Sequence, residues 1–279
     1  MLEKIHRTIR RYGLVSEGDR IFVALSGGKD SGAALAGLVT YAERFGINAE
    51  FTAFHIDFGV SGKILETVRS QAEAFKIPLR TVRPEEFGVS IKDLKGPRPI
   101  CSCCGVIKRY LMNRVPRESG ATKVATGHHA DDFIVFFFKN VLSQNFSWIS
   151  KFRPVVEGSG KLLSKIRPLF EVDGKTAKKV CEELSLPFVS EDLCPHSVLR
   201  KGSERTRERW YALVDDVEGW CPGFKVRMVR SISRMSEYFR EEWTPGECPS
   251  CGEPSGRGLC SFCKLVKRGL TGRDGSQRP

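Results

Sequence analysis

The chain has 279 residues, of which 41% are hydrophobic and 28% charged, a composition typical of a globular protein with a sizeable core. This excludes intrinsic disorder of the whole chain. The first seven residues carry charge where a signal peptide needs an apolar run. The most apolar stretch, 133–138, is far shorter than the roughly 20 residues of a membrane span. We therefore expect a cytoplasmic protein with no membrane partner.

Lys and Arg outnumber Asp and Glu by 45 to 33, which gives a net charge of +12. This surplus favours a polyanionic partner, with nucleic acid as the first candidate, although a basic solvated surface would have the same composition. There are ten cysteines. Without an export signal they argue against a disulfide scaffold, because the cytosol keeps thiols reduced. Their grouping along the chain indicates metal binding instead.

Apolar periodicity and turn residues predict that helices and strands alternate along the first two-thirds of the chain. The expected strands lie at 21–25, 51–56, 79–82, 123–126 and 187–189. The expected helices lie at 2–12, 30–45, 62–76, 104–115, 131–142 and 174–185. This alternation predicts an α/β fold whose parallel sheet is covered on both faces. Such sheets bind ligands at the carboxyl ends of their strands.

The remaining third of the chain has a different pattern. Residues 196–243 are basic and helical in pattern, whereas Gly, Pro and Cys dominate from residue 244 onward. The expected organisation is therefore a nucleotide domain at 1–195, a helical appendage at 196–243, a zinc finger at 244–264 and a basic tail at 265–279.

The segment Ser26-Gly27-Gly28-Lys29-Asp30-Ser31 follows the first expected strand and opens a helix. Its glycines allow a tight turn close to an anion, and the helix start directs free N–H groups and positive dipole toward that anion. Lys29 adds a full charge, and Asp30 can cap the helix or help to hold magnesium. The spacing differs from that of the ordinary nucleoside-triphosphatase loop. A polar turn with a good N-cap is the alternative interpretation.

This hexapeptide resembles the pyrophosphate loop of the N-type ATP pyrophosphatases, the PP-loop superfamily. Those enzymes have an adenine-nucleotide α-hydrolase-like fold, cleave ATP between the α and β phosphates, and attach AMP to a substrate oxygen. Residues 54–57 resemble the family's second-strand end near the adenosine. Residues 126–132 resemble its Gly-His-x-x-Asp-Asp segment at the nucleotide and Mg²⁺ site.

The resemblance implies a set of site residues. The implied ATP-binding residues are Ala24, Leu25, Ser26, Gly27, Gly28, Lys29, Asp30, Ser31, His55, Asp57 and Gly127. The implied catalytic residues are Lys29, Asp30, Asp131 and Asp132. Adjacent carboxylates at a strand end suit Mg–ATP, because a hard cation prefers oxygen ligands. For His128 and His129 we favour the interpretation that they are two loop residues without a catalytic role.

Three cysteines, Cys101, Cys103 and Cys104, stand together in mid-chain, and Cys194 follows the last expected strand. Zinc would need four ligands, whereas three thiolates suit a 4Fe-4S cluster with one iron open to sulfide or substrate. Ordinary buried thiols are one alternative. Another is a redox pair of Cys101 and Cys104 that transfers sulfur as a persulfide without a cluster.

Within the PP-loop superfamily, this arrangement resembles the tRNA 2-thiolation enzymes, the two-thiocytidine and two-thiouridine synthetases. Residues 101–109 resemble their Cys-x-x-Cys-Gly-x-x-[Arg/Lys]-Arg motif, and residues 194–197 resemble their Cys-Pro-Tyr-Ser motif. The resemblance implies that Cys101, Cys104 and Cys194 bind the cluster. Cys103 departs from the pattern, and it could replace Cys101 or Cys104 or be a bystander.

Two Cys-x-x-Cys pairs near the C-terminus, Cys248 with Cys251 and Cys260 with Cys263, match a structural four-thiolate zinc site. The surrounding segment has few apolar residues, so metal binding would supply its folding energy. The module resembles the C-terminal zinc finger of the two-thiouridine branch. The two-thiouridine branch commonly begins with another zinc finger, whereas this chain begins with the helix expected at 2–12, as the two-thiocytidine branch does. The resemblance therefore leaves open which base is the target.

Basic and aromatic residues alternate in two segments, which suits a partner with phosphates and stackable rings. The proposed tRNA-binding residues are Lys108, Arg109, Lys151 and Arg153, beside the aromatic residues Phe146, Trp148 and Phe152. A lid over ATP or plain surface is the alternative.

These features favour an ATP-dependent tRNA sulfurtransferase with ATP, Mg²⁺, a 4Fe-4S cluster and Zn²⁺. Its expected partners are tRNA and a sulfur donor, which is sulfide, a cysteine desulfurase or a thiocarboxylated carrier protein. A homodimer fits as well. One competing hypothesis is a PP-loop enzyme that aminates or thiolates a small molecule. Another is a non-catalytic RNA-binding protein that retains a nucleotide fold.

Overall fold

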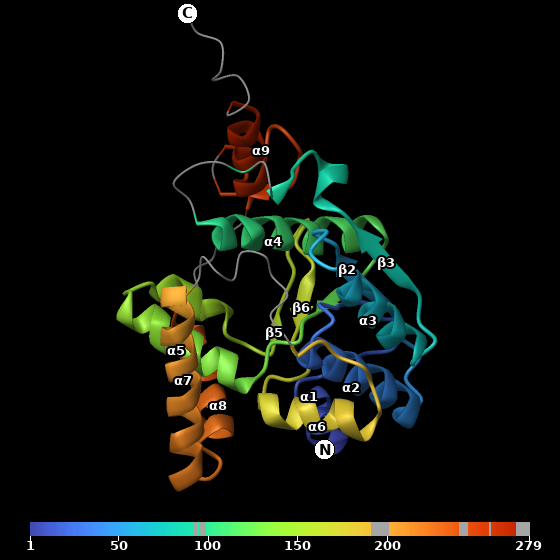
Figure 1. Cartoon of the computed structure of the whole chain (residues 1–279), viewed down its shortest axis with the longest axis vertical. Coiled ribbons are helices and arrows are strands. Elements are labelled where there is room, and N and C mark those ends of the chain that lie inside the picture. The colour runs from blue at the N-terminus through green and yellow to red at the C-terminus, as the bar shows by residue number, and fades with distance from the viewer. Residues whose placement is uncertain (92–93, 95–98, 191–200, 240–244, 257, 272–279) are drawn as a thin grey trace, which may run out of the picture.

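The computed structural model describes residues 1–91, 94, 99–190, 201–239, 245–256 and 258–271 (Figure 1). A six-stranded sheet with the order β3-β2-β1-β4-β6-β5 organises the chain. All neighbouring strands are parallel except β5, which runs antiparallel to β6. The strands are β1 (Arg20–Ala24), β2 (Glu50–Ile56), β3 (Leu79–Val82), β4 (Lys123–Ala125), β5 (Val155–Val156) and β6 (Ser164–Ile166). The predicted α/β fold with a parallel sheet is confirmed.

Strand β1 lies at the centre of the sheet, between β2 and β4. Its Val23 stands opposite Ala53 of β2 and Ala125 of β4. The three strands therefore end side by side. The segments that follow them begin at one edge of the sheet, and these are the segments that carry the nucleotide motifs.

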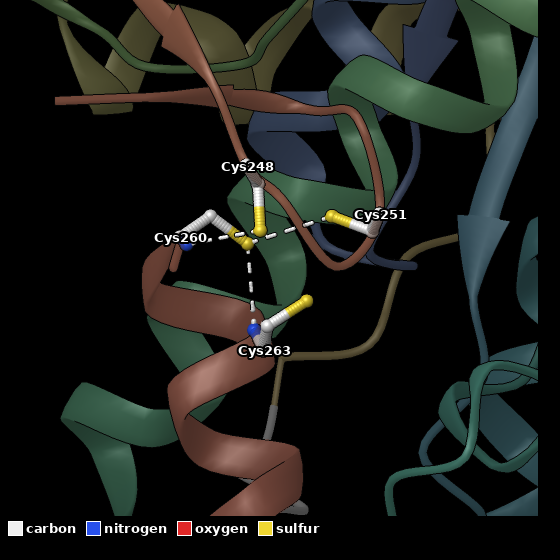
Figure 2. A group of neighbouring side chains, drawn as sticks. All are labelled: Cys248, Cys251, Cys260 and Cys263. Atoms are coloured by element: carbon white, nitrogen blue, oxygen red, sulfur yellow. Dashed lines mark hydrogen bonds between the residues drawn. The ribbon is translucent and has the colours of Figure 1, made fainter. Parts of the chain in front are cut away.

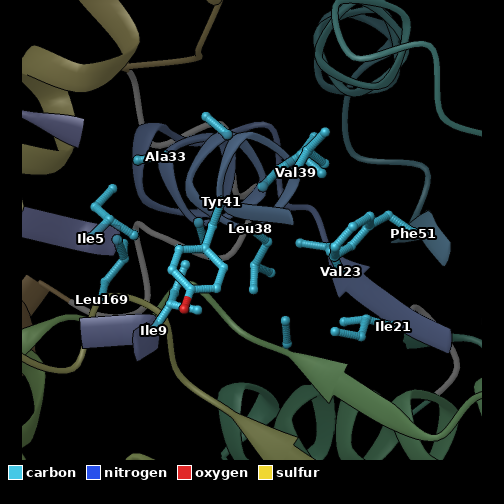
Figure 3. Packing of buried hydrophobic residues seen from close by; sticks show 14 of the residues in the cluster. Ile5, Ile9, Ile21, Val23, Ala33, Leu38, Val39, Tyr41, Phe51 and Leu169 are labelled. Carbon is cyan, nitrogen blue, oxygen red and sulfur yellow. The ribbon is translucent and has the colours of Figure 1, made fainter. Parts of the chain in front are cut away.

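One face of the sheet is covered by helices α1 (Leu2–Arg11), α2 (Lys29–Phe45), α3 (Gly62–Glu73) and α6 (Gly174–Glu183). Alternate residues of β1, among them Ile21 and Val23, point into this core (Figure 3). Helices α1 and α2 touch closely at Gly37, where an added Cβ would lie 2.3 Å from the Cγ2 atom of Ile5. This core sets α2, and with it the phosphate loop, against the sheet.

The opposite face is covered by helix α4 (Ile100–Glu118), which packs on Phe22, Phe54 and Val124. The hairpin of β7 (Gly246–Glu247) and β8 (Pro254–Ser255) and helix α9 (Ser261–Thr271) share this second core. Figure 1 shows α9 on the side of α4 that faces away from the sheet. The four C-terminal cysteines thus belong to a module that lies against α4.

A third apolar core forms beside the sheet around helix α5 (Ala130–Leu142). Helices α7 (Lys201–Trp220) and α8 (Phe224–Tyr238) and the 3₁₀ helix η3 (Phe146–Lys151) pack on it. The apolar run predicted at 133–138 is buried here at its start. The basic helical region is therefore a helix pair docked on α5.

Several details differ from the sequence prediction. The strand expected at 187–189 is wrong. Pro187 has no N–H to donate, and its carbonyl accepts from Gln71, while the N–H of Val189 donates to the carbonyl of Gly27 at 2.9 Å. Strands β5 and β6 were missed. Helix α4 begins four residues earlier than expected, because Pro99 stands at its N-cap, so the central cysteines lie within its first turns.

The short 3₁₀ helix η1 (Pro84–Phe87) follows β3. Residues 261–271, part of which was expected as a basic tail, form α9, and Leu265 is buried in the second core. Within the described residues, none of the helices combines the length and the apolar character that a membrane span requires.

Candidate active site

The phosphate loop joins β1 to α2, and Gly28 is the N-cap of that helix. Gly27 has a φ of 78°, a conformation that a residue with a Cβ rarely adopts. The hydroxyls of Ser26 and Ser31 lie 3.2 Å apart, and Ser31 Oγ donates to the carbonyl of Gly28 at 3.0 Å. The N–H of Ser26 donates to Ser31 Oγ at 3.2 Å and that of Gly28 to Ser26 Oγ at 3.4 Å, so the loop is closed on itself. The N–H groups of the first turn of α2 have no helical carbonyl to bond to and can face an anion.

Lys29 and Asp30 form the charged part of the loop. Lys29 Nζ lies 2.6 Å from Asp30 Oδ1, and both side chains are partly exposed. Asp30 therefore pairs with Lys29, and Gly28 occupies the cap position that a side chain was expected to serve. An anion entering the loop would meet the ammonium group with the carboxylate beside it.

Gly127 brings the end of β4 against the phosphate loop. A Cβ on this residue would lie 2.7 Å from the backbone nitrogen of Ser31 and 2.8 Å from the carbonyl oxygen of Asp30. Any side chain would push the two segments apart. The contact explains why glycine stands here, and it brings together two of the motifs found in the sequence.

His55 and Asp57 end strand β2. His55 is buried, its Nδ1 lies 2.9 Å from the carbonyl oxygen of Leu25, and burial lowers its pKa. Asp57 accepts from the N–H of Gly59 at 2.8 Å and from Arg83 Nε at 3.2 Å. His55 is therefore a neutral group fixed to the strand that leads into the phosphate loop.

The carboxylate of Asp131 is buried and surrounded by donors. Its Oδ1 lies 2.5 Å from Lys225 Nζ of α8. Its Oδ2 accepts from the N–H of Gly174 at 2.9 Å and lies 3.0 Å from His129 Nδ1. Burial alone would raise the pKa of Asp131, but His129, Lys225 and the Gly174 N–H together hold it well below its usual range.

Asp132 is engaged in the same way by helix α7. Its Oδ1 accepts from the hydroxyl of Tyr211 and lies 3.5 Å from Arg207 Nη2. Its Oδ2 accepts from the backbone N–H of His129 at 3.2 Å, which caps the first turn of α5. All four oxygens of the two predicted magnesium carboxylates thus have protein donors in this structure.

His129 lies between these carboxylates and the phosphate loop. Its Nε2 is 3.9 Å from Asp30 Oδ1 and 3.7 Å from Asp132 Oδ2. Burial would lower the pKa of His129, but Asp132, Asp131 and Asp30 outweigh burial and raise it. His128 is different, because its side chain is exposed and its Nδ1 lies 3.1 Å from Thr126 Oγ1. Of the two histidines expected to lack chemistry, only His129 is therefore buried among the carboxylates.

Sequence reasoning missed Lys225 and Tyr211, which hold the two carboxylates. A signal for Lys225 was available. It shares one helical face with Val229 and Ile232, which are buried at positions i+4 and i+7. A lysine on the apolar face of a helix needs a buried acidic partner, but the sequence does not say which one.

The central cysteines separate onto two sides of α4. Cys103 is 4% exposed and is buried in the second core, which α4 shares with the sheet and the C-terminal module. Cys101 is exposed and Cys104 is half-buried, and their spacing of three residues places both on one side of the helix. The pair therefore fits two thiolate ligands of one iron–sulfur group. The third expected ligand, Cys194, lies outside the described residues.

The four C-terminal cysteines converge (Figure 2). All four Sγ atoms lie within 4.8 Å of one another, an arrangement that could hold a metal ion. The N–H of Cys260 donates to Cys248 Sγ at 3.3 Å. Burial would raise the pKa of Cys248, but N–H donors from Cys260, Ser250 and Cys251 lower it, whereas burial raises the pKa of Cys260 and Cys263. Only Cys248 is thus favoured as a thiolate before metal binds, and the binding of a metal would displace the remaining thiol protons.

Three comparisons with known proteins bear on this site. The family model of the PP-loop domain matches residues 1–194. This chain belongs to the PP-loop family. The tRNA-5-methyluridine(54) 2-sulfurtransferase of Pyrococcus horikoshii is 34% identical over 269 residues, which cover 94% of this chain and 83% of that relative. The tRNA-cytidine(32) 2-sulfurtransferase of Anaeromyxobacter dehalogenans is 28% identical over 282 residues, 94% of each chain. The chain is thus a PP-loop enzyme of the tRNA 2-sulfurtransferase group.

A solved structure agrees with the fold. The U34-tRNA thiolase NcsA of Methanococcus maripaludis, solved with its 4Fe-4S cluster, superposes with a TM-score of 0.78. The match covers 97% of this chain and 87% of that one, at 24% sequence identity. At this identity the likeness supports the PP-loop fold alone.

The PP-loop enzyme carries a basic aromatic surface on α4 and η3. Trp148 is 41% exposed, with the Arg109 guanidinium 5.9 Å and Lys151 Nζ 4.8 Å from its ring centroid. Lys108 Nζ lies 5.4 Å from the ring of Phe58. Segments far apart in the sequence thus place two cations on one tryptophan. That these residues bind tRNA stays a prediction.

Arg167 and Lys165 extend this surface toward the sheet. Arg167 donates to the carbonyl of Lys151 at 2.6 Å and also to that of Arg153, which fixes the loop between η3 and β5. Burial, together with Arg167, Lys151 and Arg109, lowers the pKa of Lys165 to about 8. Within the part of the chain that the structure describes, no carboxylate forms an ion pair with Lys151 or Lys165. The cluster is therefore suited to an anion.

Proposed function

We propose that this PP-loop enzyme replaces the C2 oxygen of a tRNA pyrimidine with sulfur, using ATP. The observation that carries the proposal is the meeting of the 26–31 loop with the Gly127 segment at the strand ends, with Cys101 and Cys104 on one side of α4. The surface around Trp148 gives a phosphate-bearing, ring-containing substrate somewhere to bind. A small-molecule acceptor would not need that surface.

In the first step the pyrimidine O2 attacks the α-phosphorus of ATP, and the bond from that phosphorus to pyrophosphate breaks. The loop N–H groups and Lys29 stabilise the charge that develops on the phosphates. The target base must leave its stack, because C2 is otherwise out of reach. We propose that Ala24, Leu25, Ser26, Ser31, His55 and Asp57 line the nucleotide site together with these groups.

In the second step a hydrosulfide sulfur bonds to C2, and AMP leaves with the former O2. A bound 4Fe-4S cluster would supply an open iron for the incoming sulfur. Cys101 and Cys104 fit two of its ligands, and we propose Cys194 as the third. The sulfur donor is sulfide itself, a thiocarboxylated carrier, or a desulfurase whose persulfide sulfur is released as hydrosulfide by a reducing thiol.

Mg²⁺ enters with ATP as part of the substrate. The oxygens of Asp131 and Asp132 already accept bonds from Lys225, Tyr211 and backbone N–H groups. We therefore propose that these two carboxylates act on the nucleotide site through the groups that they hold, and that Asp30 is the carboxylate available to the metal. Zinc is the ion proposed for the C-terminal four-cysteine site, in a structural role.

The test is thiolation under anaerobic conditions. The protein, loaded with iron and sulfide, is incubated with unmodified tRNA, Mg–ATP and sulfide, and the digested nucleosides are analysed by mass spectrometry. We expect a 2-thiopyrimidine in the wild type and none with Lys29→Met. A protein that releases pyrophosphate equally well without tRNA, and forms no thionucleoside, would contradict the proposal and favour a small-molecule acceptor.

A further inference from the structure

Lys225 of helix α8 is 5% exposed and lies between two carboxylates. Its Nζ is 2.5 Å from Asp131 Oδ1 and 2.5 Å from Asp215 Oδ1. A buried ammonium is costly unless its partners are held in place, so these contacts fix the position of Asp131 strongly. Lys175 also contacts Asp215, at 3.0 Å, but its side chain is largely exposed.

The fixed Asp131 carboxylate in turn contacts the imidazole of His129. His129 Nδ1 forms no hydrogen bond but lies 3.0 Å from Asp131 Oδ2, which is a charge contact. The other ring nitrogen, Nε2, lies 3.7 Å from Asp132 Oδ2 and 3.9 Å from Asp30 Oδ1 of the phosphate loop. A Cβ on Gly174 would lie 3.1 Å from this Nε2 and 3.4 Å from Lys29 Nζ. The imidazole and the loop ammonium thus border the same small space, which exists because residue 174 has no side chain.

This series of contacts ends at the ion pair of Lys29 and Asp30 in the phosphate loop. His129 Nε2 is 3.9 Å from Asp30 Oδ1, which is itself 2.6 Å from Lys29 Nζ. An unbroken series of charged or polar contacts therefore runs from α8 through the first turn of α5 to α2. Arg207 and Tyr211 of α7 hold the neighbouring Asp132 and keep that first turn of α5 in place.

We infer that Lys225 is a positioning residue of the ATP site, and that helices α7 and α8 are part of the nucleotide machinery. Lys225 fixes Asp131, Asp131 orients His129, and His129 holds the Asp30–Lys29 pair in the geometry that receives the phosphates. Without Lys225, the buried Asp131 carboxylate would turn to another cation, and the His129 ring would follow it. The inference rests on the proposed function only in taking the loop as the ATP site.

The experiment compares three variants of the full chain. Lys225→Met removes the ammonium, Lys225→Arg keeps a cation, and Lys175→Met removes the other lysine on Asp215. For each we measure the dissociation constant of Mg–ATP, and the KM for ATP and kcat of tRNA-dependent pyrophosphate release. We expect Lys225→Met to raise the dissociation constant and KM about tenfold, Lys225→Arg to restore most of the loss, and Lys175→Met to match the wild type.

A folding defect must be separated from a positioning defect. Lys225→Met leaves Asp131 buried without its cation, so its melting temperature is measured first. The double variant Lys225→Met/Asp131→Asn removes both charges and restores neutrality. We expect it to melt close to the wild type and still to bind Mg–ATP weakly, because its residue 131 carries no charge to orient His129.

A double-mutant cycle gives the decisive readout. If Lys225 acts through His129, the losses caused by Lys225→Met and His129→Gln will not multiply in the double variant. Folded Lys225→Met protein with the wild-type dissociation constant, or losses that multiply, would overturn the inference. A wild-type protein that neither binds Mg–ATP nor releases pyrophosphate would instead overturn the proposed function.

Discussion

At the scale of single residues, helix geometry separates three cysteines that the sequence places together. Cys103 is buried in the second core, whereas Cys101 and Cys104 share another side of α4. The sequence could not make this distinction, because it predicted a helix only from residue 104. Once α4 begins at Ile100, a spacing of three residues fixes which two thiols are neighbours.

The cysteine assignment predicts different outcomes for neighbouring substitutions. Cys101→Ala and Cys104→Ala should each lose bound iron and thiolation. Cys103→Ala should keep its iron, and removing its buried sulfur should cost about 1 kcal/mol of stability. Iron analysis of anaerobically purified protein and thermal melts check these results. Iron loss confined to Cys103→Ala would reverse the assignment.

Lys165 predicts a dependence of RNA binding on pH. Its pKa of about 8 lies below the ordinary value of 10.5 because burial and nearby cations disfavour the charged form. Only the charged form attracts phosphate, so the RNA affinity of the wild type should fall as pH rises from 7 to 9. The affinity of Lys165→Met should fall less over the same range. Binding titrations at several pH values measure this, and equal pH profiles would contradict the role of Lys165.

The same shift predicts the sign of a stability change. The folded pKa of Lys165 is below the unfolded one, so the charged side chain destabilises the fold below pH 8. This cost disappears as pH rises through the folded pKa toward the unfolded value. Lys165→Met should therefore melt higher than the wild type at neutral pH, and the difference should shrink by pH 10. A difference that is constant with pH would rule out titration of Lys165 as its cause.

At the scale of elements, the C-terminal module is a support for helix α4. The rings of Tyr110 and Phe262 stack 3.8 Å apart, and Arg117 pairs with the buried carboxylate of Glu253. Lys161, just before β6, donates to the carbonyl of Gly252 at 2.9 Å. The metal site should therefore stabilise the helix that carries Cys101 and Cys104.

Loss of the metal should destabilise helix α4. Cys251→Ser should lose zinc, lower the melting temperature and speed amide hydrogen exchange across residues 105–118. Cys221→Ser, a change of the same kind outside the module, should keep zinc and leave exchange in α4 unchanged. Metal analysis and exchange mass spectrometry give both readouts. Unchanged exchange in zinc-free Cys251→Ser would show that α4 is independent of the module.

The elements also show where sequence prediction succeeds. Strands β1 and β2 are apolar runs, so they were found with errors of one residue at their ends. Strand β6 reads Ser164-Lys165-Ile166 and β5 has two residues, so neither has a periodicity to detect. The contacts of Asp131 and Asp132 with α7 and α8 join segments far apart in the chain. Only packing of the third core reveals them.

At the scale of the whole molecule, the net charge of +12 and the surface around Trp148 predict strongly salt-dependent tRNA binding. The double variant Arg109→Gln/Lys151→Gln should weaken binding. It should also lower the slope of log affinity against log salt concentration by about 2, one for each lost phosphate contact. Filter binding from low to moderate salt measures this. An unchanged slope would place the RNA elsewhere.

The central claim is that ATP activates the pyrimidine oxygen, and the fate of that oxygen tests it most directly. With tRNA carrying ¹⁸O at O2 of the target pyrimidine, AMP released during thiolation should carry one ¹⁸O atom. Mass spectrometry of AMP should find one label for each thionucleoside formed. Unlabelled AMP alongside thiolated tRNA would contradict the account, because the oxygen would then leave by another route.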